Sequence, residues 1–395
     1  MSYRLDPKEA IVVFGVLPPP GRYMGLQSYL FTRLGRFDRT SKIYQLLKRT
    51  DPFLFHIFFA KVPGEPSRIQ SLSSLSNAIN NVVIQRQSGA AFGRTRFFVI
   101  TPDRTMDSVV RQALLRLGVS SPDIFTEPIP PLGRPLGLGK PADDFVTAMR
   151  YAEPANEAAA RRWRLSLPLV VLRIRDLRPF RPAQPYPPFV VAPRTAASEA
   201  WLSQDLAHLV DGVCARWHQC PGQRTRFTDL QSPPFSLVGP SCRAIGMNCL
   251  ADTQDTAYML AGKFGLDSGQ VYAVVGTLAT QTGNATYVGL SVNETKHLLG
   301  VANISDPALK GTAAAYAARV RHTGKLFVYY LTRNCARLRN LTGGHCLSIR
   351  RRMVPAGGTF SLALRDYIRP GTERGPDSAK LLPPWVIMFR RPVAR

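Results

Sequence analysis

A proline-dense segment is the feature that most constrains how this chain can fold. Six prolines lie between Pro179 and Pro193, in the stretch RPFRPAQPYPPFVVAPRTA. Proline fixes its own φ angle and has no backbone N–H to donate, so this density excludes the interior of a helix or a sheet. We therefore predict a semi-rigid linker or surface strap over residues 179–195, between a domain of residues 1–178 and a domain of residues 196–395.

The first half alternates strand and helix patterns. The apolar runs VVFGVL, RYMGLQSYLFTR, FLFHIFFAKV, RTRFFVIT and PLVVLRIR predict strands, and the spacing of apolar residues in SRIQSLSSLSNAINNVVIQ predicts a helix. The strongest pattern is TMDSVVRQALLRLG, where the apolar residues from Met106 to Leu117 keep helical spacing. Thr105 is placed to cap the start of this helix and Gly118 its end. We expect a mixed α/β domain here.

The second half begins with one long helix and continues with strands. An apolar stripe from Leu202 to Trp217 predicts the helix in ASEAWLSQDLAHLVDGVCARWH. The segments QVYAVVGTLAT, ATYVGLSVN, KLFVYYLTR, GTFSLALRDYI and WVIMFR follow, separated by Gly, Pro and Asn. They predict a mostly antiparallel β domain, and the whole chain is expected to have an α+β fold.

The cysteines predict a disulfide framework confined to the second half. All six lie after residue 213, and an even number at short separations is typical of disulfide-bonded proteins. Six cysteines allow 15 pairings, of which we expect nearest neighbours to pair. The expected disulfides are Cys214–Cys220, Cys242–Cys249 and Cys335–Cys346. The spacings do not match a zinc ribbon, and we expect no metal site.

Four Asn-x-Ser/Thr triplets reinforce a secretory interpretation. They begin at Asn284, Asn293, Asn303 and Asn340, where chance predicts roughly one in a chain of this composition. We expect all four asparagines to lie on exposed turns or strand edges and to be glycosylation sites. The opening residues MSYRLDPKEAIVVFG lack the apolar core of a signal peptide, so either the chain is a mature form or an intracellular location is correct. No apolar run is long enough to predict a membrane span.

The charge predicts a polyanionic partner. The chain has 51 Lys and Arg against 26 Asp and Glu, a formal net charge of +25. Such a surface attracts polyanions at long range and in a salt-dependent way. The predicted contact residues are Arg161, Arg162, Arg164, Arg350, Arg351 and Arg352. The alternative interpretation of each cluster is a solvated face.

No familiar catalytic motif is present, and no cofactor is expected. The sequence contains no G-x-S-x-G, H-E-x-x-H, P-loop or G-x-G-x-x-G pattern. The only carboxylate pair that suggests chemistry is Asp252 and Asp255, in MNCLADTQDTAYML. Two carboxylates this close are able to act as an acid and a base, or to bind Ca²⁺ with further ligands. We expect instead a structural role, in which both accept hydrogen bonds from backbone N–H groups of their own loop.

Several segments resemble one family. NCLADTQDTAY, VYAVVGTLATQTGNATYVGLSVN and RDYIRPGTERGP occur in this order, and GRYMGLQSYLF lies near the start. They resemble a family of uncharacterised two-part proteins, mostly predicted to be secreted, with a loose N-C-x-G-D-x-x-D-T-x-Y element and no known activity. The resemblance implies Gly where Ala251 stands and a His near Ala279, where this chain has none. It implies an extracytoplasmic protein and no particular reaction.

These features favour a secreted or lumenal basic glycoprotein that acts through its surface. We expect it to bind an acidic polysaccharide or another polyanion, or to join other proteins in an extracellular assembly. One alternative is a secreted carbohydrate-active hydrolase or lyase that uses Asp252 and Asp255. Another is an intracellular component of a large ribonucleoprotein, for which the partner is nucleic acid.

Overall fold

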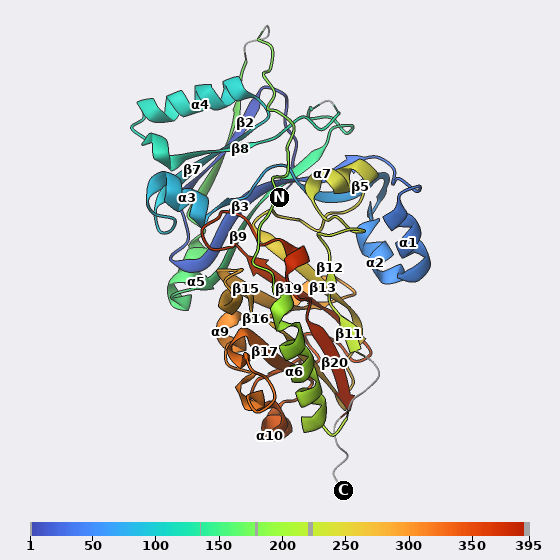
Figure 1. The fold of residues 1–395 in the computed structure, drawn as a ribbon. Coiled ribbons are helices and arrows are strands. Elements are labelled where there is room, and N and C mark those ends of the chain that lie inside the picture. Colours follow the sequence, from blue (N-terminus) through green and yellow to red (C-terminus); the bar gives the residue numbers. More distant parts are fainter. Residues whose placement is uncertain (1, 135, 178–180, 220–223, 391–395) are drawn as a thin grey trace. The chain divides into compact units, whose positions relative to one another are not determined.

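The chain forms two compact units. Unit 1 also includes one internal segment whose neighbours in the sequence, on both sides, belong to unit 2. The structure is a computed structural model that describes residues 2–134, 136–177, 181–219 and 224–390 (Figure 1). Unit 1 comprises Met1–Pro193 and Ser236–Asp255, and unit 2 comprises Arg194–Phe235 and Thr256–Arg395. The first boundary falls within the predicted linker. Ser236–Asp255, which the sequence placed with the second domain, belongs to unit 1.

Unit 1 contains two sheets. The first has the strand order β1-β9-β3-β5-β4, with β6 also paired to β3, and the second has the order β10-β2-β7-β8. The strands of the first are β1 (Ser2–Tyr3), β9 (Asp144–Pro154), β3 (Gly21–Leu34), β5 (Glu65–Ser74), β4 (Lys61–Val62) and β6 (Ile79–Asn80). Those of the second are β10 (Leu169–Arg175), β2 (Glu9–Val16), β7 (Thr95–Thr101) and β8 (Ile124–Pro128). Only β7 and β8 pair in parallel among the described strands of this unit.

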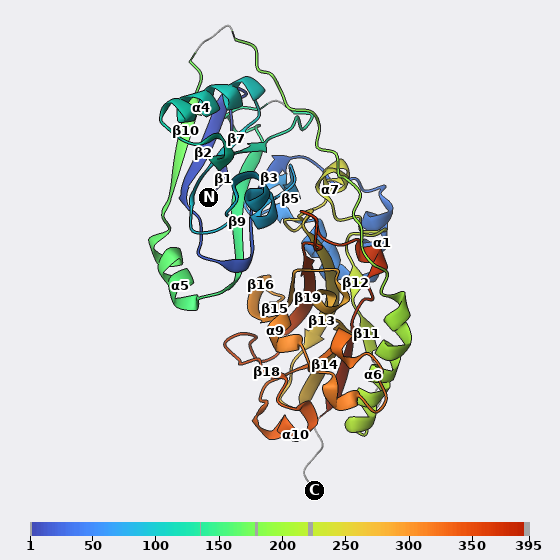
Figure 2. The same cartoon turned by 60° about the vertical axis from the view of Figure 1, so that its left-hand side comes forward.

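The helices of unit 1 lie around these sheets (Figures 1 and 2). They are α1 (Lys42–Thr50), α2 (Pro52–Phe58), α3 (Asn81–Ser88), α4 (Arg104–Arg116), α5 (Glu157–Ser166) and α7 (Gly239–Ile245). Helix α4 packs Met106 and Val110 against Val12 and Val99 of the second sheet. Leu30 and Phe145 of the first sheet pack against Ile11 and Ile100 of the second, so a core lies between the two sheets.

Unit 2 is a sandwich of two five-stranded sheets. One sheet contains β11 (Arg224–Arg226), β20 (Trp385–Arg390), β14 (Gln270–Thr277), β17 (Leu326–Thr332) and β18 (Cys346–Ser348), in that order. The other contains β12 (Thr228–Asp229), β13 (Thr256–Gly265), β19 (Thr359–Tyr367), β15 (Tyr287–Glu294) and β16 (Leu299–Ser305). Only β17 and β18 pair in parallel among the described strands of unit 2. With unit 1, this mostly antiparallel arrangement confirms the predicted α+β class.

The core of unit 2 has two layers. Leu290, Leu331 and Phe360 belong to the cluster between the two sheets. The predicted long helix is α6 (Ser203–Arg216), and Leu209, Val213 and the adjoining Trp217 pack against the outer face of the β11–β18 sheet. Short helices complete the unit: α8 (Ala279–Thr282), α9 (Asp306–Leu309) and α10 (Arg339–Thr342).

Two local predictions in the first half are wrong. The segment FLFHIFF forms α2 instead of a strand, because Pro52 occupies the first turn and the Asp51 carboxylate caps it by accepting from the N–H of Leu54. In the segment predicted as one helix from Ser67 to Gln85, the first part forms β5, where small serines fill buried positions that alternate with more exposed ones, and only the end, from Asn81, is helical, in α3. Its apolar residues fall three apart only by coincidence.

The proline-dense segment is a strap fastened at the start of α4. The buried carboxylate of Asp103 accepts hydrogen bonds from the N–H groups of Thr105 (3.1 Å) and Gln184 (2.9 Å) and pairs with Arg181. The N–H of Arg104 donates to the carbonyl of Gln184 at 2.8 Å. Asp103 therefore caps α4, in place of the predicted Thr105, and anchors the strap with the same carboxylate.

Two of the predicted disulfides are present. Cys242–Cys249 lies in unit 1 and Cys335–Cys346 in unit 2, with Cα–Cα distances of 5.6 and 5.9 Å. Cys214 is buried, and Cys220 lies outside the described residues, so their pairing stays a prediction. No helix among the described residues has the length and apolar character needed to cross a membrane.

A protonated carboxyl group links the two sheets of unit 1. Glu127 of β8 is fully buried, and its Oε1 accepts hydrogen bonds from the N–H of Ser28 in β3 and the hydroxyl of Ser76, each at 2.7 Å. Burial raises the pKa of Glu127 to about 8, although these two hydrogen bonds oppose the shift. The group is therefore neutral at pH 7 in the folded chain.

We expect the stability of the protein to fall as the pH rises from about 5 to about 8. The pKa of Glu127 is higher in the folded than in the unfolded chain, so the folded state holds a proton that the unfolded state has already released. Glu127→Gln mimics the neutral acid and should flatten this pH dependence in urea unfolding curves. Glu157→Gln, at an exposed position on α5, is the control that should keep the slope. An unchanged slope in Glu127→Gln would contradict the assignment.

Candidate polyanion-binding surface

Arg350, Arg351 and Arg352 form an exposed turn in unit 2. The turn follows β18 and is closed by the N–H groups of Met353 and Val354, which donate to the carbonyl of Arg350 at 2.9 and 3.2 Å. None of the three guanidinium groups forms a salt bridge with a carboxylate in the described part of the chain. The turn thus presents three positive charges to solvent.

A fourth arginine holds this turn in place. The guanidinium of Arg333 donates to the backbone carbonyls of Leu266 (2.9 Å), Ile349 (3.3 Å), Pro355 (3.0 Å) and Val354. Burial lowers the pKa of Arg333, and the charge of Arg351 adds to this effect. Arg333 braces the connection that links β13 of one sheet to β14 of the other against the loop that carries the three arginines. It stands alone in the sequence, so a search for basic clusters does not find it.

The arginine turn borders a hollow of about 590 Å³, here called the arginine hollow. Arg333, Arg350 and Arg351 supply its cations and Asp267 its carboxylate, and Ser268 and Gly357 are also part of its wall. The excess of positive charge and the absence of large side chains at Ser268 and Gly357 suit an anionic group such as a sulfate or a carboxylate.

The second predicted cluster lies on α5 of unit 1. Arg161, Arg162 and Arg164 are exposed, and Arg164 pairs with Glu157 on the same helix. The helix is attached through Trp163, whose indole N–H donates to the carbonyl of Val16 at 2.8 Å. Trp163 is therefore an anchor, and the three arginines are exposed.

Asp252 is a buried structural carboxylate. Its Oδ1 accepts from the N–H of Ser74 (2.8 Å), and its Oδ2 accepts from the Ser74 hydroxyl (2.7 Å) and the N–H of Gly239 (2.8 Å). Gly239 is the first residue of α7, so the carboxylate also lies at the positive end of that helix. Burial raises the pKa of Asp252, and its hydrogen bonds to Ser74 oppose this. The prediction that N–H groups of the Asp252 loop itself are the donors is wrong, because the carboxylate accepts from Ser74 and Gly239, which lie outside that loop.

Asp255 is also enclosed, and it binds different groups. Its Oδ1 accepts from the Thr253 hydroxyl at 2.7 Å, and its Oδ2 accepts from the Tyr23 hydroxyl at 2.9 Å and the Asn80 amide at 3.2 Å. Asp252 and Asp255 are each 1% exposed and have separate sets of partners, so they do not share an open cleft. The arrangement gives no support to the hydrolase alternative. Among the described residues, no cluster of three His, Cys, Asp or Glu side chains is placed to bind a metal ion.

The four predicted glycosylation sites differ in exposure. Asn303 on edge strand β16 and Asn340 in α10 are exposed, and Asn293 in β15 is half-buried. Asn284 is 0% exposed: its amide donates to the carbonyl of Ala197 (3.0 Å) and its Oδ1 accepts from the Ala197 N–H (2.9 Å). The expectation of exposure is therefore wrong for Asn284, because its side chain is used to hold a neighbouring segment.

Comparisons with known proteins do not assign the chain to a family. No family model matches the chain, and no curated protein matches it. Among solved structures, the chain is similar to an uncharacterized protein from Burkholderia cenocepacia, with a TM-score of 0.42 and 6% sequence identity, over 98% of this chain and 75% of that one. A similarity at this level carries no functional argument, and the family resemblance of the sequence stays a prediction.

We expect Asp252→Ala to lower the free energy of unfolding by about 3 kcal/mol, since it leaves two N–H groups and a hydroxyl buried without their acceptor. Chemical denaturation with far-ultraviolet circular dichroism measures the change. Asp211→Ala, which removes an exposed carboxylate from α6, should alter the free energy by less than about 0.5 kcal/mol. Equal effects of the two substitutions would show that the Asp252 network contributes little.

The position where the family resemblance implies Gly has left-handed backbone. Ala251 has φ = +57°, a conformation that an L-residue with a Cβ adopts at a cost and glycine adopts freely. We expect Ala251→Gly to raise the free energy of unfolding by about 0.5–1 kcal/mol. Ala113→Gly, at an exposed site within α4, should lower it by about the same amount. A destabilised Ala251→Gly variant would contradict the strain assigned to this residue.

Proposed function

We propose that this protein is a basic glycoprotein of the extracellular space or the secretory-pathway lumen that acts by binding an acidic polymer. The observation that carries the proposal is the Arg350–Arg352 turn, which is exposed, unpaired with carboxylates in the described structure and braced by Arg333. A braced turn loses little conformational freedom when it binds, so more of the electrostatic attraction appears as affinity.

The charge balance supports a polyanionic partner. Several carboxylates are used in internal ion pairs, including Glu9 with Arg173 and Asp144 with Arg68. The net charge of +25 leaves a large excess of arginine for the surface. Because such binding releases counterions and is screened by salt, its strength should depend steeply on ionic strength.

The disulfides support an oxidising compartment. Cys242–Cys249 and Cys335–Cys346 are of the kind that persists in secreted and lumenal proteins and is rare in reducing ones. This favours an acidic polysaccharide over nucleic acid as the partner. Exposed Asn303 and Asn340 are the asparagines at which a glycan fits best.

We expect the protein to be retained on a heparin column at low salt and released as the salt concentration rises. Replacing Arg350, Arg351 and Arg352 together with Ala should lower the salt concentration at elution more than replacing the scattered exposed arginines Arg22, Arg116 and Arg319. Both triple variants lose the same charge, so the comparison isolates the cluster. Replacing Arg161, Arg162 and Arg164 tests the α5 cluster in the same way. Equal elution of all variants and the wild type would contradict the proposal.

A further inference from the structure

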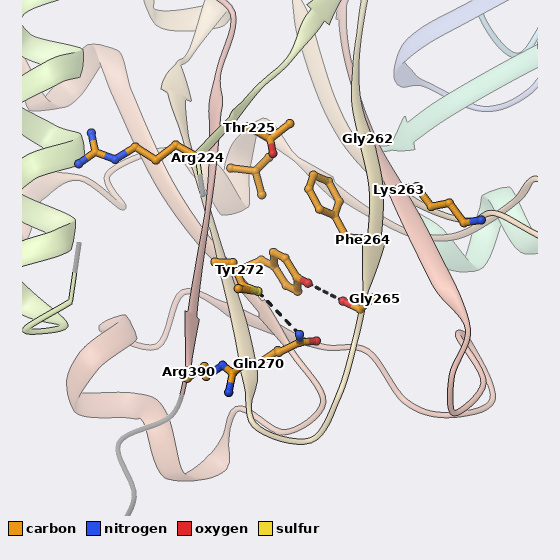
Figure 3. A pocket seen from close by; sticks show the side chains of 11 residues that line it. Arg224, Thr225, Gly262, Lys263, Phe264, Gly265, Gln270, Tyr272 and Arg390 are labelled. Atoms are coloured by element: carbon orange, nitrogen blue, oxygen red, sulfur yellow. Dashed lines mark hydrogen bonds between the residues drawn. The ribbon is translucent and has the colours of Figure 1, made fainter. Parts of the chain in front are cut away.

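A second hollow is bordered by β13 and β14, the two strands that the connection braced by Arg333 joins. It has a volume of about 740 Å³ and opens at the edge of the unit 2 sandwich, between β11, β14 and β20 of one sheet and β13 of the other (Figure 3). We call it the aromatic hollow, after Phe264 and Tyr272, which lie in its wall. Its volume is in the range of cavities that bind small molecules or single units of a polymer.

An irregularity in β13 creates this space. The pairing of β13 with β19 shifts between Ala261 and Phe264, so the strand is displaced at the residues that border the hollow. Gly262 and Gly265 add no side chains there. A Cβ atom built on Gly262 would lie 3.7 Å from Cζ of Phe264 and 4.0 Å from Cγ2 of Thr225, so a side chain at this position would project between them.

The hollow combines an aromatic wall with a polar end. The rings of Phe264 and Tyr272 are tilted against each other with centroids 5.4 Å apart, and the Tyr272 hydroxyl donates to the carbonyl of Gly265 at 2.5 Å. Phe264 is partly exposed and faces Thr225 across the space (Figure 3). Gln270 and the exposed Arg390 lie together at the opposite end. A ligand with a flat apolar face and an acidic group matches this arrangement, with the apolar face on the aromatic wall and the acidic group at the polar end.

Two further cations flank the mouth. Figure 3 shows Arg224 and Lys263 extending away from the hollow on opposite sides. The guanidinium of Arg224 reaches toward α6, where it lies 4.0 Å from Asp211. Their charges therefore act on an approaching anion near the mouth, whereas binding inside the hollow depends on Phe264, Gln270 and Arg390.

The aromatic hollow and the arginine hollow are both bordered by the segment that runs from β13 through the connection at Leu266–Ser268 into β14. Gly262–Gly265 and Gln270 border the first, and Leu266, Asp267 and Ser268 border the second. A chain molecule bound at Arg350 and Arg351 therefore needs to cross only this connection to reach Phe264. The two hollows have the positions expected of neighbouring subsites for one extended ligand.

We propose that the aromatic hollow receives a sugar ring of an acidic polysaccharide whose anionic groups bind at Arg350 and Arg351. The apolar CH face of a pyranose packs on an aromatic ring, while its carboxylate or sulfate pairs with a guanidinium such as that of Arg390. A single partly exposed ring suits one sugar unit, whereas proteins that bind single-stranded nucleic acid stack successive bases on several aromatic side chains. This inference rests on the proposed function and specifies its ligand.

Isothermal titration with three probes of similar charge tests the inference: a heparin-derived hexasaccharide, inorganic polyphosphate and an oligothymidylate. Gly262→Leu fills the hollow and should weaken hexasaccharide binding about tenfold, the effect of losing one stacked ring. It should leave polyphosphate binding unchanged. Gly324→Leu, where a Cβ meets no atom within 4 Å, is the matched control and should leave both unchanged. Phe264→Leu, which keeps apolar volume but removes the ring, repeats the test should Gly262→Leu fail to fold.

The outcomes separate this inference from the proposed function. Unchanged hexasaccharide binding in folded Gly262→Leu or Phe264→Leu would overturn the sugar subsite. An equal loss for the oligothymidylate would overturn it too, in favour of nucleic acid. The double variant Arg350→Ala and Arg351→Ala should weaken both hexasaccharide and polyphosphate. If it weakens neither, the proposed function fails, whatever Gly262→Leu does.

Discussion

The buried carboxylate of Asp252 is the interaction on which the construction of unit 1 depends. It binds the end of β5 through Ser74 and the start of α7 through Gly239. A carboxylate removed from water is costly unless donors surround it, so the donors of Ser74 favour the position of Ser236–Asp255 against the first sheet. Gly239 allows this approach, because a Cβ there would lie 2.2 Å from the carbonyl oxygen of Ser74. The Cys242–Cys249 disulfide closes the same segment.

The basic loop of unit 2 is also held by a charged side chain surrounded by hydrogen-bond partners, but here the charge is positive and the partners are carbonyl acceptors. The guanidinium of Arg333 donates hydrogen bonds to backbone carbonyls that accept none from a neighbouring strand. These hydrogen bonds hold in place an irregular loop that has no hydrophobic core of its own. The Cys335–Cys346 disulfide restricts the conformational freedom of the chain just before this loop. Because Arg333 holds this loop in place, the three adjacent arginines form a candidate binding surface and not merely a solvated one.

The carboxylates of this protein act mainly as hydrogen-bond and ion-pair partners in the interior, whereas its arginines lie both in the interior and on the surface. Arg68 is 2% exposed, and it pairs with Asp144 and donates to the carbonyl of Ala142. Asp103 is fully buried and fastens the proline strap through Arg181. Because internal pairs of this kind use acidic groups, the surface clusters have few acidic neighbours, and the net positive charge becomes a property of the surface.

The sequence by itself determined the elements whose signals are local. Helices α4 and α6 follow from apolar spacing, and two disulfides follow from short separations between cysteines. Tertiary structure decided the rest, because the deciding partners are distant in the chain. Asp255 meets Tyr23 across 232 residues, and Asn284 is buried by Ala197 rather than by anything in its own motif. Likewise, Arg333 acquires its role, and the two hollows exist, only where strands and loops far apart in sequence meet around the connection between β13 and β14.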